Sequence, residues 1–297
     1  MELRHLRYAL AIAEELHFTR AAAKLGIGQP PLSQQIKALE KELGVQLFHR
    51  MTRGVELTEA GEAFMPLAQA SVAAAEQAAA AAQRAAKGEI GEFAIGFTSS
   101  ASYNPIVPRI IGRFRELYPE LSIRLIEQDT TRLLRAMADG ALDIAFLRPA
   151  LGETDGLIVK RLPDEELLVA LPPKHRLAGP ETKRVNLVDL AGDPFILYPR
   201  SNGRLLYDSM IAACRNAGFS PRISQEAPQM ASTVNLVAAG VGVALVPASM
   251  NQLHAHGVVY KRIKGDGPKA QLVVAHRRAG PLSPTVRNFM GCVSVGE

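Results

Sequence analysis

The chain has 297 residues, enough for two or three domains, and its 47% hydrophobic and 21% charged residues exclude intrinsic disorder as the default. Its net charge of +5 at neutral pH allows a polyanionic partner without requiring one. The two cysteines, Cys214 and Cys292, are too far apart in the sequence for a metal-ligand motif or a disulfide framework. We find no apolar run of about 18 residues and no signal-peptide pattern, and therefore expect a cytoplasmic protein that makes no membrane contact.

Residues 1–57 contain three short helical patterns. The first starts at Leu3, and Thr19 is expected to cap a second helix that ends at Gly26. The third begins with two prolines, which the first turn of a helix tolerates because its N–H groups have no partner within the helix. Its apolar residues follow helical spacing and should face the core: Leu32, Ile36, Leu39 and Leu43.

The opposite face of the third helix carries polar side chains suited to DNA, since serine, glutamine and lysine can bind base edges or phosphates. Residues 17–53 hold six Lys or Arg against two acidic residues, and a basic turn over 50–54 between short strands is typical of a wing. The alternative is a polar three-helix interaction module. The candidate DNA contacts are Thr19, Arg20, Gln29, Pro30, Pro31, Ser33, Gln34, Lys37, Arg50, Thr52 and Arg53.

Residues 58–87 are rich in alanine, which makes up 12 of the 19 residues over 68–86. Alanine has the highest helix propensity, so we predict one long helix with Thr58 at its N-cap. Pro66 removes a backbone donor and can kink this helix. Small side chains let a second helix approach closely, which favours pairing with another copy; the alternative is a disordered low-complexity linker.

From Glu92 onward, apolar strand-length runs alternate with helical ones, which is typical of parallel sheets covered by helices. The first unit has strands over 93–97, 122–126 and 142–147, with helices over 105–117 and 132–138. A second, similar unit follows, with strands over 166–171, 194–198, 222–225 and 243–246, helices over 203–217 and 230–239, and then a run over 271–275 and a helix over 284–290. Two such units imply a cleft between them, where open α/β sheets bind ligands at the carboxyl ends of their strands.

Small hydroxyl residues stand where the first two strands of this region meet their helices. Hydroxyls and free N–H groups at such junctions favour an anion, although the same residues can be helix caps only. Arg148 follows the third strand, and Arg204 lies in a loop after the strand that ends at Tyr198. The candidate contacts of a small carboxylate effector are Ser99, Ser100, Thr130, Arg148 and Arg204.

Several motifs resemble the LysR-type transcriptional regulators, and they cover nearly the whole chain. The N-terminal ones are Met1-Glu2-Leu3-Arg4-His5-Leu6-Arg7-Tyr8, Phe18-Thr19-Arg20-Ala21-Ala22, Gln29-Pro30-Pro31-Leu32-Ser33-Gln34-Gln35-Ile36, Leu47-Phe48-His49-Arg50 and Leu57-Thr58-Glu59-Ala60-Gly61. The later ones are Gly140-Ala141-Leu142-Asp143, Leu236-Val237-Ala238-Ala239-Gly240-Val241-Gly242 and Val246-Pro247. Within the family the chain looks most like the branch that senses small carboxylates, such as regulators of aromatic catabolism and of acetoin operons.

The resemblance implies an N-terminal winged helix-turn-helix over 1–57, a long linker helix over 58–88 that pairs two chains, and an α/β effector domain over 89–297. That domain would have the two-lobed, type 2 periplasmic-binding-protein-like fold, with lobe I over about 89–161 plus 268–297 and lobe II over about 162–267. The implied function is a ligand-responsive transcriptional regulator that binds a palindromic site in double-stranded promoter DNA. The implied partners are a small carboxylate effector, further copies of the chain in a homodimer or homotetramer, and RNA polymerase.

A second function class uses the same two-lobed fold in solute-binding modules and in enzymes. However, the sequence has no Gly-x-Ser-x-Gly elbow, no His-Glu-x-x-His pair and no Gly-x-x-x-x-Gly-Lys-Ser/Thr loop. We therefore predict that the chain is not an enzyme and uses neither a metal nor another cofactor. The N-terminal segment separates the two classes, because neither a solute receptor nor an enzyme needs a recognition helix.

Overall fold

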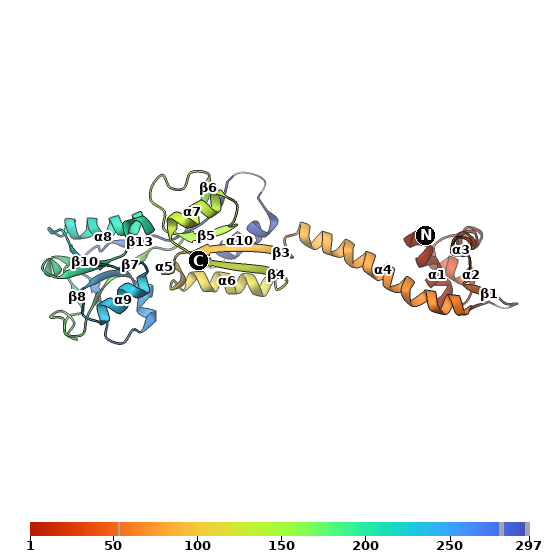
Figure 1. The fold of residues 1–297 in the computed structure, drawn as a ribbon, viewed down its shortest axis with the longest axis horizontal. Coiled ribbons are helices and arrows are strands. Elements are labelled where there is room, and N and C mark those ends of the chain that lie inside the picture. The colour runs from red at the N-terminus through yellow and green to blue at the C-terminus, as the bar shows by residue number, and fades with distance from the viewer. Residues whose placement is uncertain (53, 279–281, 295–297) are drawn as a thin grey trace. The chain divides into compact units, whose positions relative to one another are not determined.

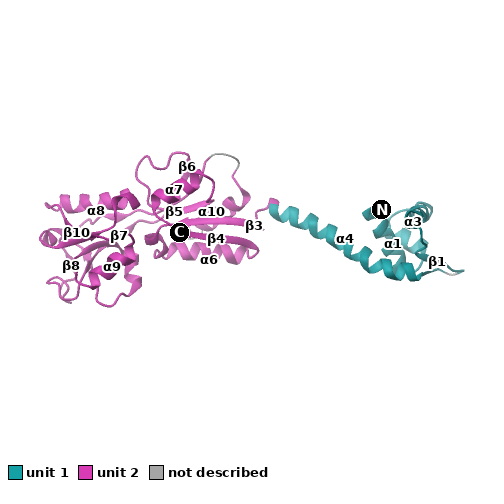
Figure 2. Cartoon of the chain, in the orientation of Figure 1, with its two compact units in different colours: residues 1–85 teal, residues 86–297 magenta. Residues whose placement is uncertain are grey.

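The computed structural model describes the chain except for residues 53, 279–281 and 295–297 (Figure 1). The chain divides into two compact units, residues 1–85 and 86–297, coloured separately in Figure 2. Among the described residues no helix is long and apolar enough to cross a membrane, and no group of three or more His, Cys, Asp or Glu could hold a metal ion.

The first unit contains three helices, a two-stranded hairpin and nearly all of a fourth, long helix. The helices α1, α2 and α3 pack around a core that includes Ala9, Ile12 and the apolar stripe predicted for the third helix. The hairpin pairs its strands antiparallel, with Phe48 opposite Leu57. The elements are α1 (Leu3–Glu15), α2 (Phe18–Leu25), α3 (Gln29–Leu43), β1 (Phe48–Arg50), β2 (Val55–Leu57) and α4 (Glu59–Ala86).

One cap prediction was wrong. Helix α2 begins at Phe18, one residue before Thr19, and His17 is its N-cap. The Nδ1 atom of His17 accepts a hydrogen bond from the Thr19 backbone N–H at 3.2 Å. An imidazole nitrogen therefore caps this helix, where a hydroxyl was expected.

Helix α4 begins with a tight junction to the hairpin. Thr58 Oγ1 accepts from the Gly61 N–H at 2.9 Å, as the predicted cap does, and donates to the Gln46 carbonyl at 2.6 Å. The helix then continues to Ala86 and includes Pro66, so the alternative of a disordered linker is wrong. Its alanines are mostly exposed within this single chain.

The second unit consists of two lobes. Lobe I is a five-stranded sheet in the order β4-β3-β5-β14-β6, in which β3, β4 and β5 are parallel and β14 is antiparallel to β5 and β6. Its strands are β3 (Gly91–Phe97), β4 (Leu121–Glu127), β5 (Ile144–Leu147), β6 (Leu157–Arg161) and β14 (Val273–Arg277). Its helices are α5 (Ser99–Ser102), α6 (Ile106–Leu117), α7 (Thr130–Ala138) and α10 (Pro284–Ser294).

Alternation along β3 sends side chains to two separate cores. Phe93 faces α6 and α10, where its ring lies 5.2 Å from that of Phe114 and 5.5 Å from that of Phe289. Ala94 faces the other core, which includes Leu133 of α7. Helices therefore cover both faces of the sheet, as parallel strands require.

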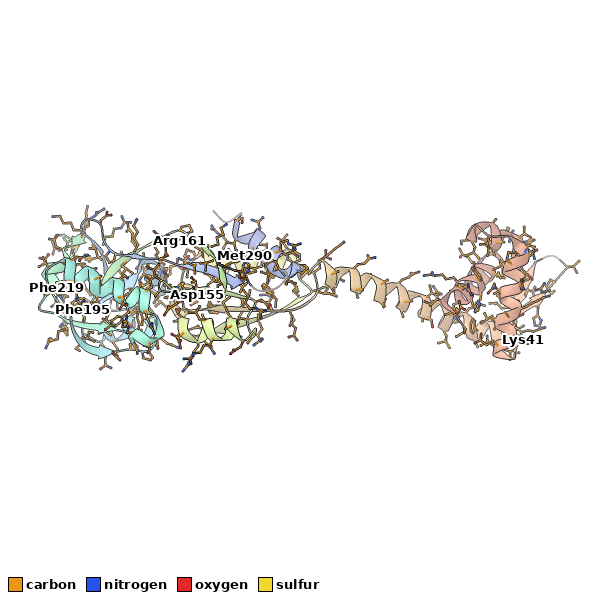
Figure 3. All side chains as sticks on the ribbon, turned by 90° about the horizontal axis from the view of Figure 1, so that it is seen from above. Lys41, Asp155, Arg161, Phe195, Phe219 and Met290 are labelled. Carbon is orange, nitrogen blue, oxygen red and sulfur yellow. The ribbon has the colours of Figure 1, made fainter. Side chains whose placement is uncertain are left out.

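Lobe II repeats this plan. Parallel β9 and β10 connect through a bridge between Phe195 and Val243 to a sheet in the order β11-β7-β12-β8, and β13 pairs with the start of β7. The Phe195 ring packs against Phe219 with centroids 6.0 Å apart (Figure 3). The strands are β7 (Glu165–Leu171), β8 (Arg184–Val185), β9 (Pro194–Leu197), β10 (Arg222–Glu226), β11 (Ala244–Pro247), β12 (Val259–Ile263) and β13 (Lys269–Ala270). The helices are α8 (Arg204–Asn216) and α9 (Met230–Ala238), with short 3-10 turns η1 (Leu187–Leu190), η2 (Arg200–Asn202) and η3 (Ala248–Leu253).

The chain passes between the lobes twice, along adjacent segments. The Leu162 N–H donates to the Leu272 carbonyl at 3.0 Å, and Ala270 pairs with Glu165 at the start of β7. Two neighbouring connections of this kind form a hinge, and they leave the rest of the space between the lobes for a cleft.

We predict that Gly61→Ala destabilises the first unit. A Cβ atom at this position would lie 2.2 Å from the Leu47 carbonyl oxygen, a backbone atom that cannot turn away. Overpacking of this kind typically costs about 1–3 kcal/mol, which urea denaturation of the full chain would measure. The control is Gly112→Ala in α6, where the added Cβ meets nothing within 4 Å; that helix should gain about 0.5–1 kcal/mol. Equal stability of the Gly61 variant and wild type would contradict the close approach.

Candidate functional site

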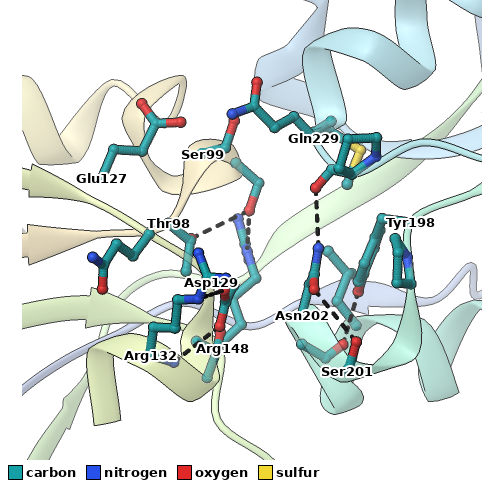
Figure 4. A pocket seen from close by; sticks show the side chains of 18 residues that line it. Thr98, Ser99, Glu127, Asp129, Arg132, Arg148, Tyr198, Ser201, Asn202 and Gln229 are labelled. Atoms are coloured by element: carbon teal, nitrogen blue, oxygen red, sulfur yellow. Dashed lines mark hydrogen bonds and ion pairs between the residues drawn. The ribbon is translucent and has the colours of Figure 1, made fainter. Parts of the chain in front are cut away.

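A cavity of about 450 Å³ lies between the two lobes, at the carboxyl ends of their strands (Figure 4). Lobe I contributes the ends of β3, β4 and β5, and lobe II contributes the segments that follow β9 and β10. The lining residues are Thr98, Ser99, Ser100, Glu127, Gln128, Asp129, Thr130, Arg132, Arg148, Tyr198, Pro199, Ser201, Asn202, Gly203, Leu206, Pro228, Gln229 and Met230.

Helices from both lobes begin at this cavity. In lobe I, α7 starts at Thr130 and its N-cap residue Asp129 accepts from the Arg132 N–H at 2.9 Å. In lobe II, α8 and α9 start beside the lining residues Gly203 and Met230. The first N–H groups of a helix have no carbonyl partner within it and carry a partial positive charge, so the cavity favours an anion.

Two predicted hydroxyl residues are buried in this wall. Thr130 is 3% exposed and Ser100 is 8% exposed, while Ser99 is half-buried on the same short helix α5. Ser100 Oγ lies 3.5 Å from Thr98 Oγ1 and accepts a hydrogen bond from Arg148 Nε at 3.3 Å. The structure therefore brings together Ser99, Ser100, Thr130 and Arg148, four of the five residues predicted to contact the effector.

Arg148 is the charged centre of the cavity wall. Its side chain is 3% exposed, and its Nη2 donates to Glu165 Oε2 at 3.1 Å. Burial lowers the pKa of the Arg148 guanidinium, and the adjacent carboxylate of Glu165 partly offsets that shift. The Nη1 atom is buried and has no hydrogen-bond partner among the described residues. A buried guanidinium with a free N–H pair beside a ligand cavity is a donor that an anion can use.

Glu165, which sequence analysis did not select, connects the two lobes at the hinge. Its Oε2 also accepts from Asn104 Nδ2 of lobe I at 3.2 Å, and its Oε1 accepts from the Ser249 N–H of lobe II. The pairing of Glu165 with Arg148 joins residues 17 positions apart across a lobe boundary. Helical or strand periodicity therefore carries no signal for it.

Arg204 is not part of the cavity. Its side chain is 58% exposed, and its Nε lies 3.5 Å from Glu153 Oε1 in lobe I. Beside the cavity, Thr131 Oγ1 donates to the Ser201 carbonyl at 2.9 Å. These two contacts join the lobes. Arg204 therefore pairs with a residue of the other lobe, where a contact with the effector was expected.

Tyr198 is a further lining residue that sequence analysis named only as the end of a strand. Its hydroxyl donates to the Gly203 carbonyl at 3.0 Å and holds the loop that leads into α8. Burial raises the pKa of Tyr198, so the phenol stays protonated and keeps this bond at ordinary pH. The sequence signal that could have selected Tyr198 is an aromatic residue at the carboxyl end of a predicted strand.

On the first unit, the predicted DNA contacts lie mainly along the exposed face of α3. Pro30, Pro31, Gln34 and Lys37 are exposed, and Gln29 and Ser33 are half-buried. Thr19, Arg20, Arg50 and Thr52 are exposed on α2 and the hairpin, and Arg53 lies outside the described residues.

Two of the predicted cations already have partners. Arg20 Nε lies 3.6 Å from Glu15 Oε2, which partly neutralises its charge. Arg50 Nη2 donates to Ser33 Oγ at 3.0 Å, so this hairpin arginine reaches back to the recognition helix.

Known protein families match both units of this chain. The pattern described as "Bacterial regulatory helix-turn-helix protein, lysR family" matches residues 3–62, and that described as "LysR substrate binding domain" matches residues 86–294. The chain belongs to the LysR family of transcriptional regulators. It is therefore a ligand-responsive, DNA-binding regulator with a winged helix-turn-helix and a two-lobed α/β effector domain.

Relatives and solved structures match this LysR-family chain along its whole length. It is 38% identical over 290 residues to the HTH-type transcriptional regulator AlsR of Bacillus subtilis, covering 98% of this chain and 94% of AlsR. It is 37% identical to CatR of Pseudomonas putida, covering 99% of each. The crystal structure of CbnR, a LysR family transcriptional regulator, superposes with a TM-score of 0.87 at 27% identity, covering 99% of this chain and 100% of CbnR. Full-length CbnR in complex with its target DNA superposes with a TM-score of 0.86 at 27% identity, covering 100% and 99%.

We predict that Glu165→Gln strongly destabilises the effector domain. Loss of the carboxylate charge leaves the buried Arg148 guanidinium without a counter-charge, which typically costs about 3–5 kcal/mol. Thermal or urea denaturation of the full chain would measure the loss. The matched control is the neighbouring Glu166→Gln, because Glu166 is exposed and pairs only loosely with Arg262 at 4.0 Å; it should cost less than about 1 kcal/mol. If both variants are equally stable, the pair does not hold the hinge.

Proposed function

We propose that the cavity between the lobes binds a small carboxylate, and that this ligand is the effector to which the regulator responds. The observation that carries the proposal is the buried Arg148 guanidinium, with Nη1 free of protein partners among the described residues and Nε on Ser100. The helix N-termini at the cavity add partial positive charge without adding a cation. A carboxylate supplies the compact charge and planar acceptor pair that such donors fit.

Charges in the cavity wall support a carboxylate of limited charge. Glu127 and Asp129 also line the cavity, but Asp129 forms an ion pair with Arg132 at 3.3 Å. Glu165 likewise neutralises Arg148, so Glu127 is left as the unbalanced charge among these residues. Binding would then depend on the local donors around Ser100, Thr130 and Arg148, and a strongly polyanionic ligand would meet Glu127.

We propose further that α3 enters the major groove, with Gln29, Ser33, Gln34 and Lys37 facing the bases. Alanine-rich α4 would pair two copies, giving a homodimer or homotetramer whose symmetry matches a palindromic site. Ligand binding can change the spacing of the DNA-binding pairs only if it favours one arrangement of the lobes over another. Transcription would then change through RNA polymerase, and the chain would carry out no catalysis.

The effector proposal predicts that Ser100→Ala and Thr130→Val each weaken effector binding by about one to two decades. Hydrogen bonds to a charged group contribute about 1.5–3 kcal/mol each, and each 1.4 kcal/mol is about tenfold. The ligand would first be found by thermal shift of the full chain against small carboxylic acids and their neutral amides, and its affinity then measured by calorimetry. The control is Ser102→Ala, which removes the same atom from α5 but does not line the cavity. Equal stabilisation by acids and amides, or unchanged binding in both variants, would refute the anion site.

The DNA proposal predicts that Ser33→Ala and Gln34→Ala weaken binding to a DNA site selected from random sequence. Loss of one base contact typically costs about 1–3 kcal/mol, while the melting temperature should change little because both side chains lie on the outer face of α3. Fluorescence anisotropy against selected and scrambled DNA would measure both effects. Wild-type affinity in both variants would assign the base contacts to another face.

A further inference from the structure

Three elements of the first unit meet at the Arg50 side chain. Arg50 ends the hairpin strand β1, and its Nη2 donates to Ser33 Oγ on α3 at 3.0 Å. Its guanidinium carbon lies 5.0 Å from the ring centroid of Phe18, the first residue of α2. The Phe18 ring is itself packed edge-on against Phe48, with centroids 6.3 Å apart. The guanidinium is thus held between an aromatic face and a hydroxyl of the recognition helix.

Ser33 has a defined hydrogen-bond direction because of this contact. A serine hydroxyl has one proton to donate and two lone pairs to accept with, whereas arginine can only donate. Oγ therefore accepts from Arg50, and its own proton points elsewhere. Among the described residues Arg50 is the sole hydrogen-bond partner of Ser33 Oγ. A bond from a cation also polarises the hydroxyl, which makes it a stronger donor.

We infer that Arg50 is a positioning residue for base recognition: it presets Ser33 as a hydrogen-bond donor to an acceptor on a base edge. The acceptors in the major groove are N7 of either purine, O6 of guanine and O4 of thymine, whereas the amino groups of cytosine and adenine offer only donors. Arg50 would thus act through Ser33 on sequence preference, a role different from the phosphate contact that the charge of the wing predicts. This inference depends on the proposed position of α3 in the groove.

The test compares Arg50→Lys with Ser33→Ala in the full-length protein. Lysine keeps the positive charge and any phosphate contact, but its side chain is one bond shorter and lacks the planar fork that stacks on Phe18, so the bond to Ser33 Oγ should be lost. Each variant would be used to select binding sites from random DNA, and its affinity measured for the wild-type site and for single-base changes at several salt concentrations. We expect the preference for an acceptor at one base position to fall about tenfold in both variants, at the same position in each. The salt dependence of binding should not change.

Two further variants separate this role from others. The double variant should bind no more weakly than Ser33→Ala alone, because both changes remove one hydrogen-bonded unit. Phe18→Leu, which keeps an apolar side chain but removes the aromatic face, should lose part of the same preference. The matched control is Arg4→Gln, which removes an exposed cation that is paired with Glu2 at the start of α1 and has no contact with Ser33. Its base preferences should equal those of wild type.

The outcomes distinguish the inference from the proposed function on which it depends. If Ser33→Ala loses the preference but Arg50→Lys keeps it, α3 reads the bases and the role of Arg50 is refuted. A further variant, Arg50→Gln, removes the charge: if it lowers the salt slope of log K by about 0.9 and leaves every base preference as in wild type, Arg50 is a phosphate contact and the inference is refuted. If Ser33→Ala changes no base preference, both the inference and the assigned face of α3 are wrong.

Discussion

The buried pair between Arg148 and Glu165 constrains the effector domain more than any other contact described above. Each charge lies in a medium that solvates it poorly, so each depends on the other and on the neutral donors around them. Because Arg148 follows a strand of lobe I and Glu165 begins a strand of lobe II, this neutralisation also fixes the two lobes at their hinge. The same guanidinium presents its remaining donors to the cavity, so hinge integrity and ligand recognition depend on one side chain.

The repeated plan of the two lobes explains why the cavity has polar groups on both sides. In each lobe, parallel strands end toward the same space, and the following helices begin there. The lobes nevertheless differ in chemistry: lobe I supplies the buried hydroxyls and the arginine, whereas lobe II supplies Tyr198 and the loop around Asn202. A ligand that contacts both sides binds most tightly when the lobes are at one particular separation. Ligand binding therefore favours that separation over the others.

Periodicity predicted the elements whose apolar residues face one core, such as α3 with its Leu32 stripe and α6 with Phe114. It did not predict β6 and β12, where charged residues such as Lys160 and Lys261 interrupt the apolar runs. The cavity hydroxyls could be predicted because they follow strands directly. Glu165 and the orientation of Arg204 could not, because each depends on a partner in the other lobe. The bond from Arg50 to Ser33 was missed for a similar reason: it joins hairpin and helix across 17 residues.

Lobe I is discontinuous in the sequence, since its sheet contains β14 and its core contains Phe289 of α10. On the ribosome these parts emerge after the whole of lobe II, so the strands β3, β4 and β5 must wait for most of the chain to be made. Synthesis proceeds at about 5–20 residues per second, so the part of the β3 face that α10 covers stays open for roughly ten seconds or more. The helix-turn-helix and lobe II, by contrast, are continuous and can fold as they appear. The order of folding would then be the DNA-binding unit, lobe II and last lobe I, so the cleft is completed only when synthesis is nearly finished.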